Sequence, residues 1–357
     1  MLAVLFILIT LFPALQPETS TDTVYVPVLC YHDFYSEGRA PGTLSEKYAR
    51  FEDLLKWLQA EGYRSLLPGP DDTTPPGDGR NIIFTFDDGN ITQLRAALLL
   101  EQYGFRGIFF VIPAFIDQPG KAHFTSGQIR SLAQRGHQIG IHGFEHKSMI
   151  AYGSEIAQAA DTSITITAAI IGKDAARLAF AFPYGHYSRA VVSMYSNHFS
   201  HLYTVNPGYW NTTSTLIPRM LITPQRDPDF YRNYIISAAG FRPLLRFLDD
   251  DASSRNVIQI SSTEKLDGTD IYLLTPAADQ FGLHYNPWRI EQIKKTAARP
   301  GEYHYSIDLG DYLQTYHKME NAILAMALVG FTDNRFRFMS DGYLFRIREI
   351  SPERPGE

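Results

Sequence analysis

The chain has 357 residues, of which 45% are hydrophobic and 20% are charged, and its formal net charge is −6. This composition is typical of a globular protein with a sizeable core, in one large domain or in one domain beside a smaller one. Lys and Arg are scattered along the sequence, which excludes the basic clusters that nucleic acids or anionic membrane surfaces would need.

Residues 1–15 form an apolar run without a charged side chain. A run of about fifteen residues is too short to span a membrane comfortably and is typical of the apolar part of a secretory signal. No Lys or Arg precedes it and no clear small-x-small cleavage site follows, so an uncleaved anchor, or a buried strand or helix, stays an alternative. The polar residues 16–23 are expected to be a linker. We expect an exported protein (periplasmic, extracellular or membrane-anchored) that associates with a membrane only through this N-terminal segment, if it is not cleaved.

The folded part is predicted to begin with an apolar strand over 24–31, which ends in the polar pair His32-Asp33. Taken alone, this pair indicates no more than a capped strand end. Cys30, in the same strand, is the only cysteine, which excludes an intrachain disulfide and a cysteine-based zinc site. Its apolar neighbours predict a buried small hydrophobic residue.

A helix is predicted over 45–60, with Ser45 as its cap. Its apolar face, at helical spacing, consists of Phe51, Leu54, Leu55 and Leu58. A short strand over 63–67 and a loop rich in Pro and Gly over 68–80 follow.

The next strand, 81–86, is rich in β-branched and aromatic residues and is predicted to be buried. It ends in Asp87, Asp88 and Gly89, and two adjacent carboxylates pack poorly at the end of a buried strand but suit a functional site. Neighbouring strand residues point to opposite faces, yet the chain bends at a strand end, where both acids can line one cavity in different roles. The alternative is an ordinary Asp-Gly turn, and motifs further along the chain decide between the two.

Beyond this turn, predicted helices alternate with shorter predicted strands. The helices are 91–103, 125–135, 154–171 and 187–199, and the strands are 107–112, 178–182 and 201–205. Thr125 and Gln128 have the spacing of a capping box at the start of the second helix. This alternation is typical of βα units around a parallel sheet.

Two histidines, His142 and His146, are separated by three residues. Two imidazoles at this spacing can bind one ion, across a helical turn or around a tight loop, and Gly143 and the preceding strand favour the loop. Considered alone, the pair could be two unrelated surface histidines. Together with Asp88 it becomes a set of two histidines and one carboxylate with open positions, which suits Zn²⁺ or another divalent transition ion at a catalytic site.

Three motifs in this order resemble the NodB-type polysaccharide deacetylases, carbohydrate esterase family 4. They are Thr-Phe-Asp-Asp-Gly (85–89), His-x-x-x-His (142–146) and Phe-Pro-Tyr-Gly (182–185). The resemblance covers 24–240 and implies an α/β fold, a distorted (β/α)₇-like barrel whose site lies at the carboxyl ends of the strands. The remaining residues, 241–357, are expected to be a C-terminal extension that completes the barrel or forms a small α+β module.

The resemblance implies a role for each matching residue. Asp87 corresponds to the general base of the family. The metal ligands correspond to Asp88, His142 and His146, and the implied ion is divalent, with Zn²⁺ expected first and Co²⁺ or Ni²⁺ as alternatives. The wall of the substrate groove corresponds to Pro183, Tyr184 and Gly185, and the backbone N–H of Tyr184 helps to hold the oxyanion.

The chain departs from the family pattern at two positions. Many members carry an Arg two residues before the proline of the third motif, where it orients the base, and this chain has Ala181 there. Arg219 is the candidate substitute. Many members also place their general acid, a histidine, in a C-terminal Leu-x-His motif, and the predicted strand at 256–261 has no histidine.

A subgroup, the poly-β-1,6-N-acetylglucosamine deacetylases of biofilm systems, places the acid histidine in a Tyr-His-Asp phrase on the first strand. This chain is similar to them in that respect, since His32 stands between Tyr31 and Asp33. His32 is therefore the expected general acid and Asp33 the expected partner that holds its orientation. His186 and His284 are the reserve candidates.

The activity implied by this resemblance is metal-dependent hydrolysis of N-acetyl groups on an N-acetylhexosamine polysaccharide, with release of acetate. The expected substrate is an exopolysaccharide such as poly-N-acetylglucosamine, the enzyme class is a hydrolase of non-peptide C–N bonds in linear amides, and the protein is expected to be a monomer. The alternatives are a non-catalytic carbohydrate-binding relative and a hydrolase of O-acetyl esters or small amides.

The sequence of 241–357 is less informative. An apolar helix over 311–329 and a terminal strand over 343–350 are predicted. Trp288 and the Tyr-rich stretch 303–316 fit core or surface packing better than a platform for sugars.

Overall fold

The computed structural model of the protein describes most of the chain up to residue 240 and a set of strands beyond it. The described ranges are 24–38, 41–69, 80–120, 122–149, 152–172, 178–187, 189–212, 214–240, 245–247, 257–262, 265–266, 270–279, 282–289, 293–299, 302–308, 323–332, 335–339 and 343–346. The expected signal and linker (1–23) and most of the expected loop 68–80 lie outside them.

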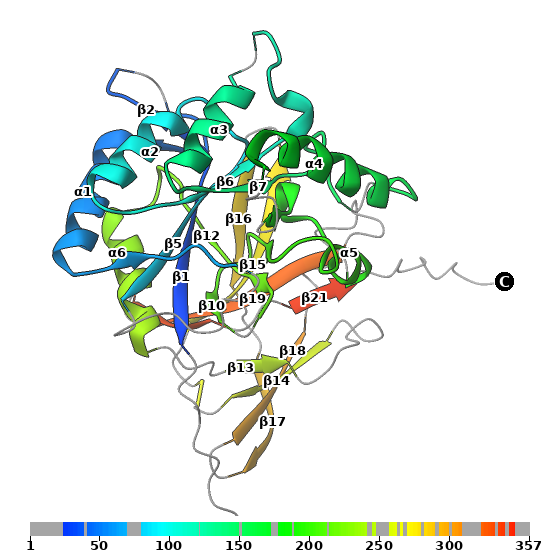
Figure 1. The fold of residues 1–357 in the computed structure, drawn as a ribbon. Helices are drawn as coiled ribbons and strands as arrows, with labels where there is room; N and C mark the ends of the chain where they lie inside the picture. Colours follow the sequence, from blue (N-terminus) through cyan, green and yellow to red (C-terminus); the bar gives the residue numbers. More distant parts are fainter. Residues whose placement is uncertain are drawn as a thin grey trace, which may run out of the picture.

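The centre of the molecule is a ten-stranded mixed sheet that curls into a nearly closed barrel (Figure 1). Its main path runs in the order β10-β1-β5-β6-β7-β8-β9-β11, with β4 paired to β5 and β12 paired to β1. The strands are β1 (Tyr25–Tyr31), β4 (Arg64–Ser65), β5 (Asn81–Phe86), β6 (Ile108–Val111), β7 (Gln138–Ile141), β8 (Phe180–Ala181), β9 (Leu202–Tyr203), β10 (Tyr209–Asn211), β11 (Leu216–Ile217) and β12 (Met220–Leu221). All neighbours on this path pair in parallel except β1 and β10, and the edge strands β10 and β11 contact each other. The expected fold class, a distorted α/β barrel, is therefore confirmed.

Helices cover the outside of this barrel, and they alternate with the strands as predicted (Figure 1). They are α1 (Tyr48–Ala60), α2 (Gln93–Gln102), α3 (Ser126–Gln134), α4 (Ile156–Ile171), α5 (Arg189–Tyr195) and α6 (Pro228–Ser237). The predicted capping box at Thr125 and Gln128 is present at the start of α3. Most predicted elements are thus found, with ends displaced by a few residues.

Two buried clusters hold the barrel together. The larger one lies between the strands and the helices and includes Leu29 and Tyr31 of β1. The smaller one includes Val26 and Val28 of the same strand, together with side chains from β5, β6, β8, β9, β10 and β11, which meet only inside the barrel. Every residue of β1 is therefore buried, as expected for a parallel strand that is covered on both faces.

The start of α1 differs from the prediction. The helix begins at Tyr48, and Ser45–Lys47 instead form a short strand, β3, which pairs with β2 (Asp33–Tyr35). The hydroxyl of Ser45 donates to Asp33 at 3.1 Å, so it does not cap the helix, which has no side-chain cap. The predicted apolar face is confirmed, because its four residues all lie against or within the core.

The described residues beyond 240 are strands in two antiparallel sheets. The first has the order β13-β14-β18-β17 and consists of Leu245–Phe247, Val257–Ser262, Glu302–Asp308 and Ile293–Arg299. The second has the order β16-β15-β19-β20, with β21 also paired to β19, and consists of Gly282–Arg289, Asp270–Asp279, Ile323–Thr332, Arg335–Met339 and Tyr343–Arg346. Strand β15 contacts the Pro183–Gly185 turn, so the extension reaches the barrel.

The helix predicted over 311–329 is wrong for 323–329, which belong to β19, and its earlier part lies outside the described residues. The predicted terminal strand is present as β21, and the strand predicted over 256–261 is present as β14. Tyr305, within the Tyr-rich stretch, is buried, which fits packing rather than an exposed sugar platform.

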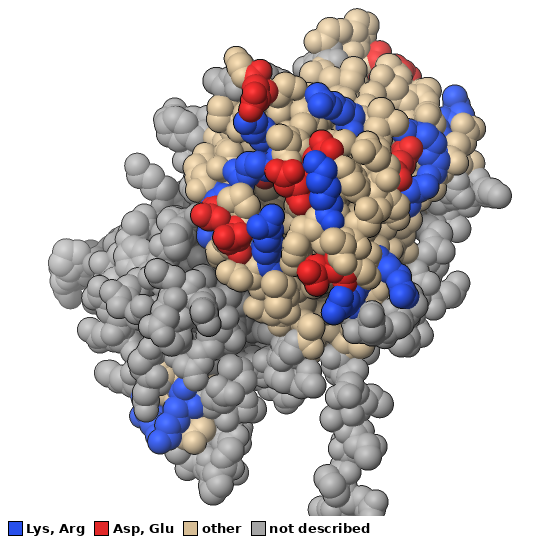
Figure 2. All heavy atoms as spheres, turned by 90° about the vertical axis from the view of Figure 1, so that its left-hand side faces the viewer, with Lys and Arg blue, Asp and Glu red and all other residues tan. Residues whose placement is uncertain are grey.

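No helix in the described part of the chain has the length and apolar character that crossing a membrane requires. Figure 2 shows the face that lies at the left of Figure 1, where acidic and basic side chains are intermixed and neither sign gathers into one large patch. Ion pairs on α1 and α6 belong to this pattern, such as Lys56 with Glu52 at 3.2 Å and Arg232 with Asp229 at 3.1 Å.

Candidate active site

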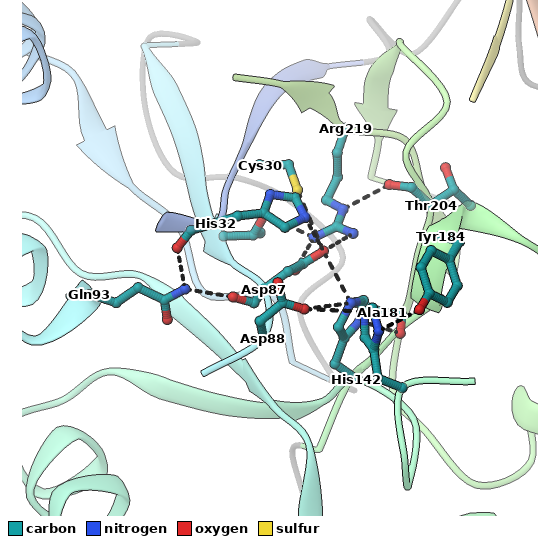
Figure 3. A network of polar contacts seen from close by, with 12 residues as sticks. Cys30, His32, Asp87, Asp88, Gln93, His142, Ala181, Tyr184, Thr204 and Arg219 are labelled. Carbon is teal, nitrogen blue, oxygen red and sulfur yellow. Dashed lines mark hydrogen bonds and ion pairs between the residues drawn. The ribbon is translucent and has the colours of Figure 1, made fainter. Parts of the chain in front are cut away.

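Most of the predicted site residues lie at or just after the carboxyl ends of four strands. His32 follows β1, the pair Asp87-Asp88 follows β5, His142 follows β7, and the Pro183–Gly185 turn follows β8. These strands run in parallel, so their carboxyl ends meet at one edge of the barrel. Figure 3 shows the resulting cluster, in which these side chains point toward one another.

Asp87 is the more buried of the two carboxylates in this cluster, with only 1% of its surface exposed. Its two carboxylate oxygens accept hydrogen bonds from the two terminal nitrogens of Arg219, at 2.6 and 2.8 Å. Burial raises the pKa of Asp87, but the positive charge of Arg219, with smaller effects of His142 and His32, outweighs it and lowers the pKa to about 2. Asp87 is therefore ionised at neutral pH.

Arg219 is itself completely buried, just before β12. Its Nε donates to the backbone carbonyl of Thr204 at 2.7 Å, and Nη1 also donates to the hydroxyl of Thr85 at 3.1 Å. Hydrogen bonds to Thr204, Thr85 and Asp87 thus fix the orientation of the guanidinium. The structure places it on Asp87, where the sequence suggested that it replaces the arginine missing at Ala181.

Asp88, His142 and His146 form a group whose potential ligand atoms all lie within 4.8 Å of one another. Nε2 of His142 and of His146 are 3.4 and 3.2 Å from Oδ1 of Asp88. Burial raises the pKa of Asp88, but His146, His32 and His142 together bring the pKa well below its usual range. Oδ1 of Asp88 is buried and has no hydrogen-bond partner. A cation bound by Asp88 and the two imidazoles would coordinate this oxygen and compensate its burial.

The other nitrogen of each imidazole has a partner of its own. Nδ1 of His142 lies 3.0 Å from the carbonyl oxygen of Ala181, and Nδ1 of His146 lies 3.0 Å from the hydroxyl of Tyr184. A carbonyl only accepts, so Nδ1 of His142 carries the proton and its Nε2 is left with a free lone pair facing Asp88. Partners of this kind orient histidine ligands in metal sites.

Three of the four non-glycine residues with positive φ in the described ranges belong to this cluster. They are Asp88 (φ 73°), His146 (φ 58°) and Tyr184 (φ 58°), and Asp117 is the fourth. Gly143 (φ 69°) lies between the histidine positions, where an added Cβ would approach Cγ of Pro183 to 2.9 Å. Unusual backbone conformations held by their surroundings are concentrated at functional sites.

His32 lies beside the buried carboxylate, with Nε2 3.9 Å from Oδ2 of Asp87, and is 8% exposed. Its Nδ1 has no hydrogen-bond partner, so the expected hold by Asp33 is not found. Asp33 instead accepts from the hydroxyls of Thr92 and Ser45, at 2.8 and 3.1 Å. Successive residues of an extended chain point in opposite directions, which accounts for the different partners of His32 and Asp33.

The reserve histidines have other surroundings. Nδ1 of His186 lies 3.0 Å from the hydroxyl of Ser148, and the described contacts of His186 do not include Asp87 or Asp88. His284 lies on β16 opposite Ala277, and its side chain lies outside the description.

Two residues at this site were not predicted to belong to it. Cys30 is buried as expected, but its thiol also donates to Oδ2 of Asp87 at 3.5 Å. Its position two residues before His32 on one strand could have indicated that both face the same side. Gln93 donates from Nε2 to the backbone carbonyls of His32 and Asp87, and no residue pattern in the sequence signals a contact of this kind.

The fold and this cluster define an α/β barrel with a candidate metal site and a buried carboxylate at the carboxyl ends of its strands. Residues 74–199 match the family model described as polysaccharide deacetylase. This range contains Asp87, Asp88, His142, His146 and Tyr184, whereas His32 and Arg219 lie outside it. Over this range the chain is therefore similar to polysaccharide deacetylases.

Solved structures with a similar fold include two bacterial deacetylases. The deacetylase PplD of Streptococcus pyogenes, in complex with acetate, is 20% identical, with a TM-score of 0.54 over 60% of this chain and 99% of that one. A polysaccharide deacetylase from Bacillus cereus is 21% identical, with a TM-score of 0.52 over 60% of this chain and 69% of that one. At this identity the likeness shows the fold. No curated protein matches the chain.

Proposed function

We propose that the protein is a metal-dependent polysaccharide N-deacetylase. The observation that carries this proposal is that two groups lie side by side at the carboxyl ends of the barrel strands. One is the ligand group Asp88, His142 and His146, and the other is the ionised Asp87 held by Arg219. Hydrolysis of an amide requires a polarised carbonyl, a base for the attacking water and an acid for the leaving amine. The cluster offers a candidate for each.

The ligand group fits a divalent transition ion. Two imidazoles and one carboxylate leave open positions, as catalytic zinc sites do, and both imidazoles are oriented by partners behind them. Zn²⁺ is proposed first, with Co²⁺ and Ni²⁺ as alternatives. When bound, such an ion polarises the acetamide carbonyl and makes water more acidic.

Asp87 is the proposed general base. It is ionised at neutral pH, and its oxygens are held at fixed positions by Arg219, so it is oriented before substrate binds. In this role it accepts the proton of the water that attacks the acetyl carbon. The proposed oxyanion donor is the backbone N–H of Tyr184, in the turn walled by Pro183 and Gly185.

His32 is the proposed general acid, which gives a proton to the departing amine. Two observations support this role. His32 is buried beside Asp87, with 3.9 Å between its Nε2 and Oδ2 of Asp87, and the contacts described for the reserve candidate His186 include no such carboxylate. An amine leaves poorly unless it is protonated, so this acid matters more for an amide than for an ester.

The proposed substrate is an N-acetylhexosamine exopolysaccharide such as poly-N-acetylglucosamine, and the products are acetate and a free amine on the polymer. The support is the Tyr31-His32-Asp33 order on the first strand, which carries the proposed acid. We further propose that the protein is exported through its N-terminal segment, to the periplasm, the cell exterior or a membrane anchor, and acts as a monomer in biofilm-type polysaccharide metabolism.

The test is acetate release from N-acetylglucosamine oligomers by the metal-stripped protein, before and after addition of Zn²⁺, Co²⁺ or Ni²⁺. We expect activity only with metal, and loss of at least about 100-fold in kcat for Asp87→Asn and for His32→Gln. The matched control is His186→Gln, which should keep most of the activity. O-acetylated oligomers are assayed in parallel, because an ester should depend less on His32.

Each other outcome points to a different function. Tight metal binding without turnover of any N-acetyl oligomer would favour a non-catalytic carbohydrate-binding relative, or an O-acetyl esterase if the esters are cleaved. Failure to bind metal would overturn the assignment of Asp88, His142 and His146, and with it the mechanism. Loss of activity in His186→Gln but not in His32→Gln would move the general acid to His186.

A further inference from the structure

One buried side chain, that of Gln93, joins the two strand ends that carry the proposed acid and base (Figure 3). Its amide nitrogen Nε2 donates to the backbone carbonyl of His32 at 2.6 Å and to that of Asp87 at 2.5 Å. Two carbonyl acceptors on one atom determine which end of the amide is nitrogen, because an oxygen there would face only acceptors. Gln93 is completely buried.

These two hydrogen bonds lie just beyond the end of a backbone ladder. Strands β1 and β5 pair in parallel as far as Tyr31 and Phe86, and the N–H of Asp87 then donates to the carbonyl of Tyr31 at 2.9 Å. The next carbonyls, of His32 and Asp87, are bridged by the side chain of Gln93. The amide therefore extends the connection between the two chains to the residues that carry the chemistry.

The bridge is anchored at the start of α2. The backbone N–H of Gln93 donates to the carbonyl of Asn90 at 3.0 Å, which closes the turn after β5. The preceding residue, Thr92, donates its hydroxyl to Asp33 at 2.8 Å and accepts from the N–H of Phe34 at 3.1 Å. Two successive residues of this turn thus hold the segment after β1 from one side.

We infer that Gln93 is a positioning residue, which fixes the separation between His32 and Asp87 through their backbones. This inference rests on the proposed function, because it assumes that these two residues act as acid and base. Their side chains lie 3.9 Å apart, between Nε2 and Oδ2, and a proton acceptor and a proton donor must reach opposite sides of one reacting group. Gln93 itself touches neither the proposed ligand group nor the described groove residues through any described hydrogen bond.

The test replaces Gln93 with residues of nearly equal size. Gln93→Met keeps the length of the side chain and removes both donors, and Gln93→Glu places carboxylate oxygens against two carbonyls. We expect kcat to fall by about 10- to 100-fold in Gln93→Met and further in Gln93→Glu, since a misplacement of about 1 Å costs about 100-fold. KM and the Kd for Zn²⁺ should change by less than about threefold, because the ligand group has its own supports.

The matched control is Leu100→Ala, which removes buried volume from the core on the same helix, about two turns beyond Gln93. It should lower thermal stability at least as much as Gln93→Met does and leave kcat near the wild-type value. If Gln93→Met lowers kcat no more than the control, at a temperature where both are folded, the inference is wrong and the residue is only structural. A rise in KM with unchanged kcat would overturn it as well.

A second readout separates this inference from the proposed function. If the wild-type protein deacetylates no substrate, the proposed function fails, and the position of His32 is then followed by the ¹H–¹⁵N spectrum of its ring. We expect the ring signals of His32 to shift or broaden in Gln93→Met and to stay unchanged in Leu100→Ala. Unchanged signals in both variants would show that Gln93 does not position His32.

Discussion

At the scale of single residues, the site depends on a buried charge that is paired on both of its oxygens. Asp87 and Arg219 are 1% and 0% exposed, and a bidentate pair satisfies both oxygens of the carboxylate at once. Removing one partner of such a pair leaves an uncompensated charge in the interior, which costs far more than the loss of a surface ion pair.

Arg219→Met should therefore affect both stability and activity. We expect a loss of about 3–5 kcal/mol in the free energy of unfolding and a fall of about 100-fold in kcat, since the carboxylate loses its orientation. Arg219→Lys keeps the charge but not the two parallel donors, and its activity should lie between those of wild type and Arg219→Met. The measurements are urea unfolding and acetate release.

The control for this prediction is Lys56→Met, since Lys56 is half exposed and pairs with Glu52 on the surface of α1. Its free energy of unfolding should change by less than about 1 kcal/mol. A similarly small change for Arg219→Met would mean that the buried pair does not compensate the charge of Asp87.

Which residues could be predicted from the sequence depends on how their contacts are made. Asp87, Asp88, His142 and His146 lie in motifs with fixed spacing, so the sequence was enough to expect them together. Arg219 was expected only because Ala181 stands where many family members have an arginine, and it is far from Asp87 in the sequence. The contacts of Gln93 go to backbone carbonyls, and every residue has one, so no side-chain pattern could indicate them.

At the scale of elements, the histidine loop and the turn after β8 must approach each other closely. Gly143 has φ 69°, and a Cβ at this position would lie 2.9 Å from Cγ of Pro183. The contact is between a rigid proline ring and a backbone that already has a left-handed conformation, so neither side can yield cheaply.

Gly143→Ala should therefore be more harmful than the same substitution at a glycine with room around it. Gly104 has φ 80° and nothing within 4 Å of an added Cβ, so Gly104→Ala isolates the cost of the conformation, about 1–2 kcal/mol. We expect Gly143→Ala to lose about 1–3 kcal/mol more and to bind Zn²⁺ more weakly, as measured by thermal unfolding and metal titration. Equal losses in the two variants would argue against the close contact.

The helices of the barrel were predictable from their periodicity and its strands from short apolar runs, but the longer apolar run at 323–332 was not. The helices of the barrel showed apolar faces at helical spacing. Residues 323–332 are almost entirely apolar, and such a run fits a buried helix as well as a central strand. In the structure β19 lies between β15 and β20, so pairing with distant strands decided its conformation. At Ser45 the pairing of β3 with β2 likewise prevailed over a helix cap.

At the scale of the whole molecule, the proposed ion connects separate βα units. Asp88 follows β5 and the two histidines follow β7, with β6 between these strands in the sheet. A ligand that binds only the folded protein stabilises it in proportion to the logarithm of its concentration. The proposed metal should therefore be visible in the unfolding of the entire barrel.

Stripping the metal should lower the melting temperature, and Zn²⁺ should restore it. At a free concentration of 100 times Kd the gain is about 2.7 kcal/mol, which corresponds to several degrees for a domain of this size. The gain should disappear in His142→Ala and persist in His198→Ala, whose histidine lies outside the ligand group. A melting temperature that does not respond to the ion, or responds equally in both variants, would contradict the proposed site.

The distance along the chain between Asp87 and Arg219 has a consequence for the order in which a nascent chain can fold. All three proposed metal ligands have been synthesised by residue 146, and the range that matches the family model ends at residue 199. The guanidinium that neutralises the buried carboxylate emerges from the ribosome later still, 132 residues after it. Until then, closing the barrel over Asp87 would bury a charge without a partner, so the interior of the barrel should stay open to water during most of translation.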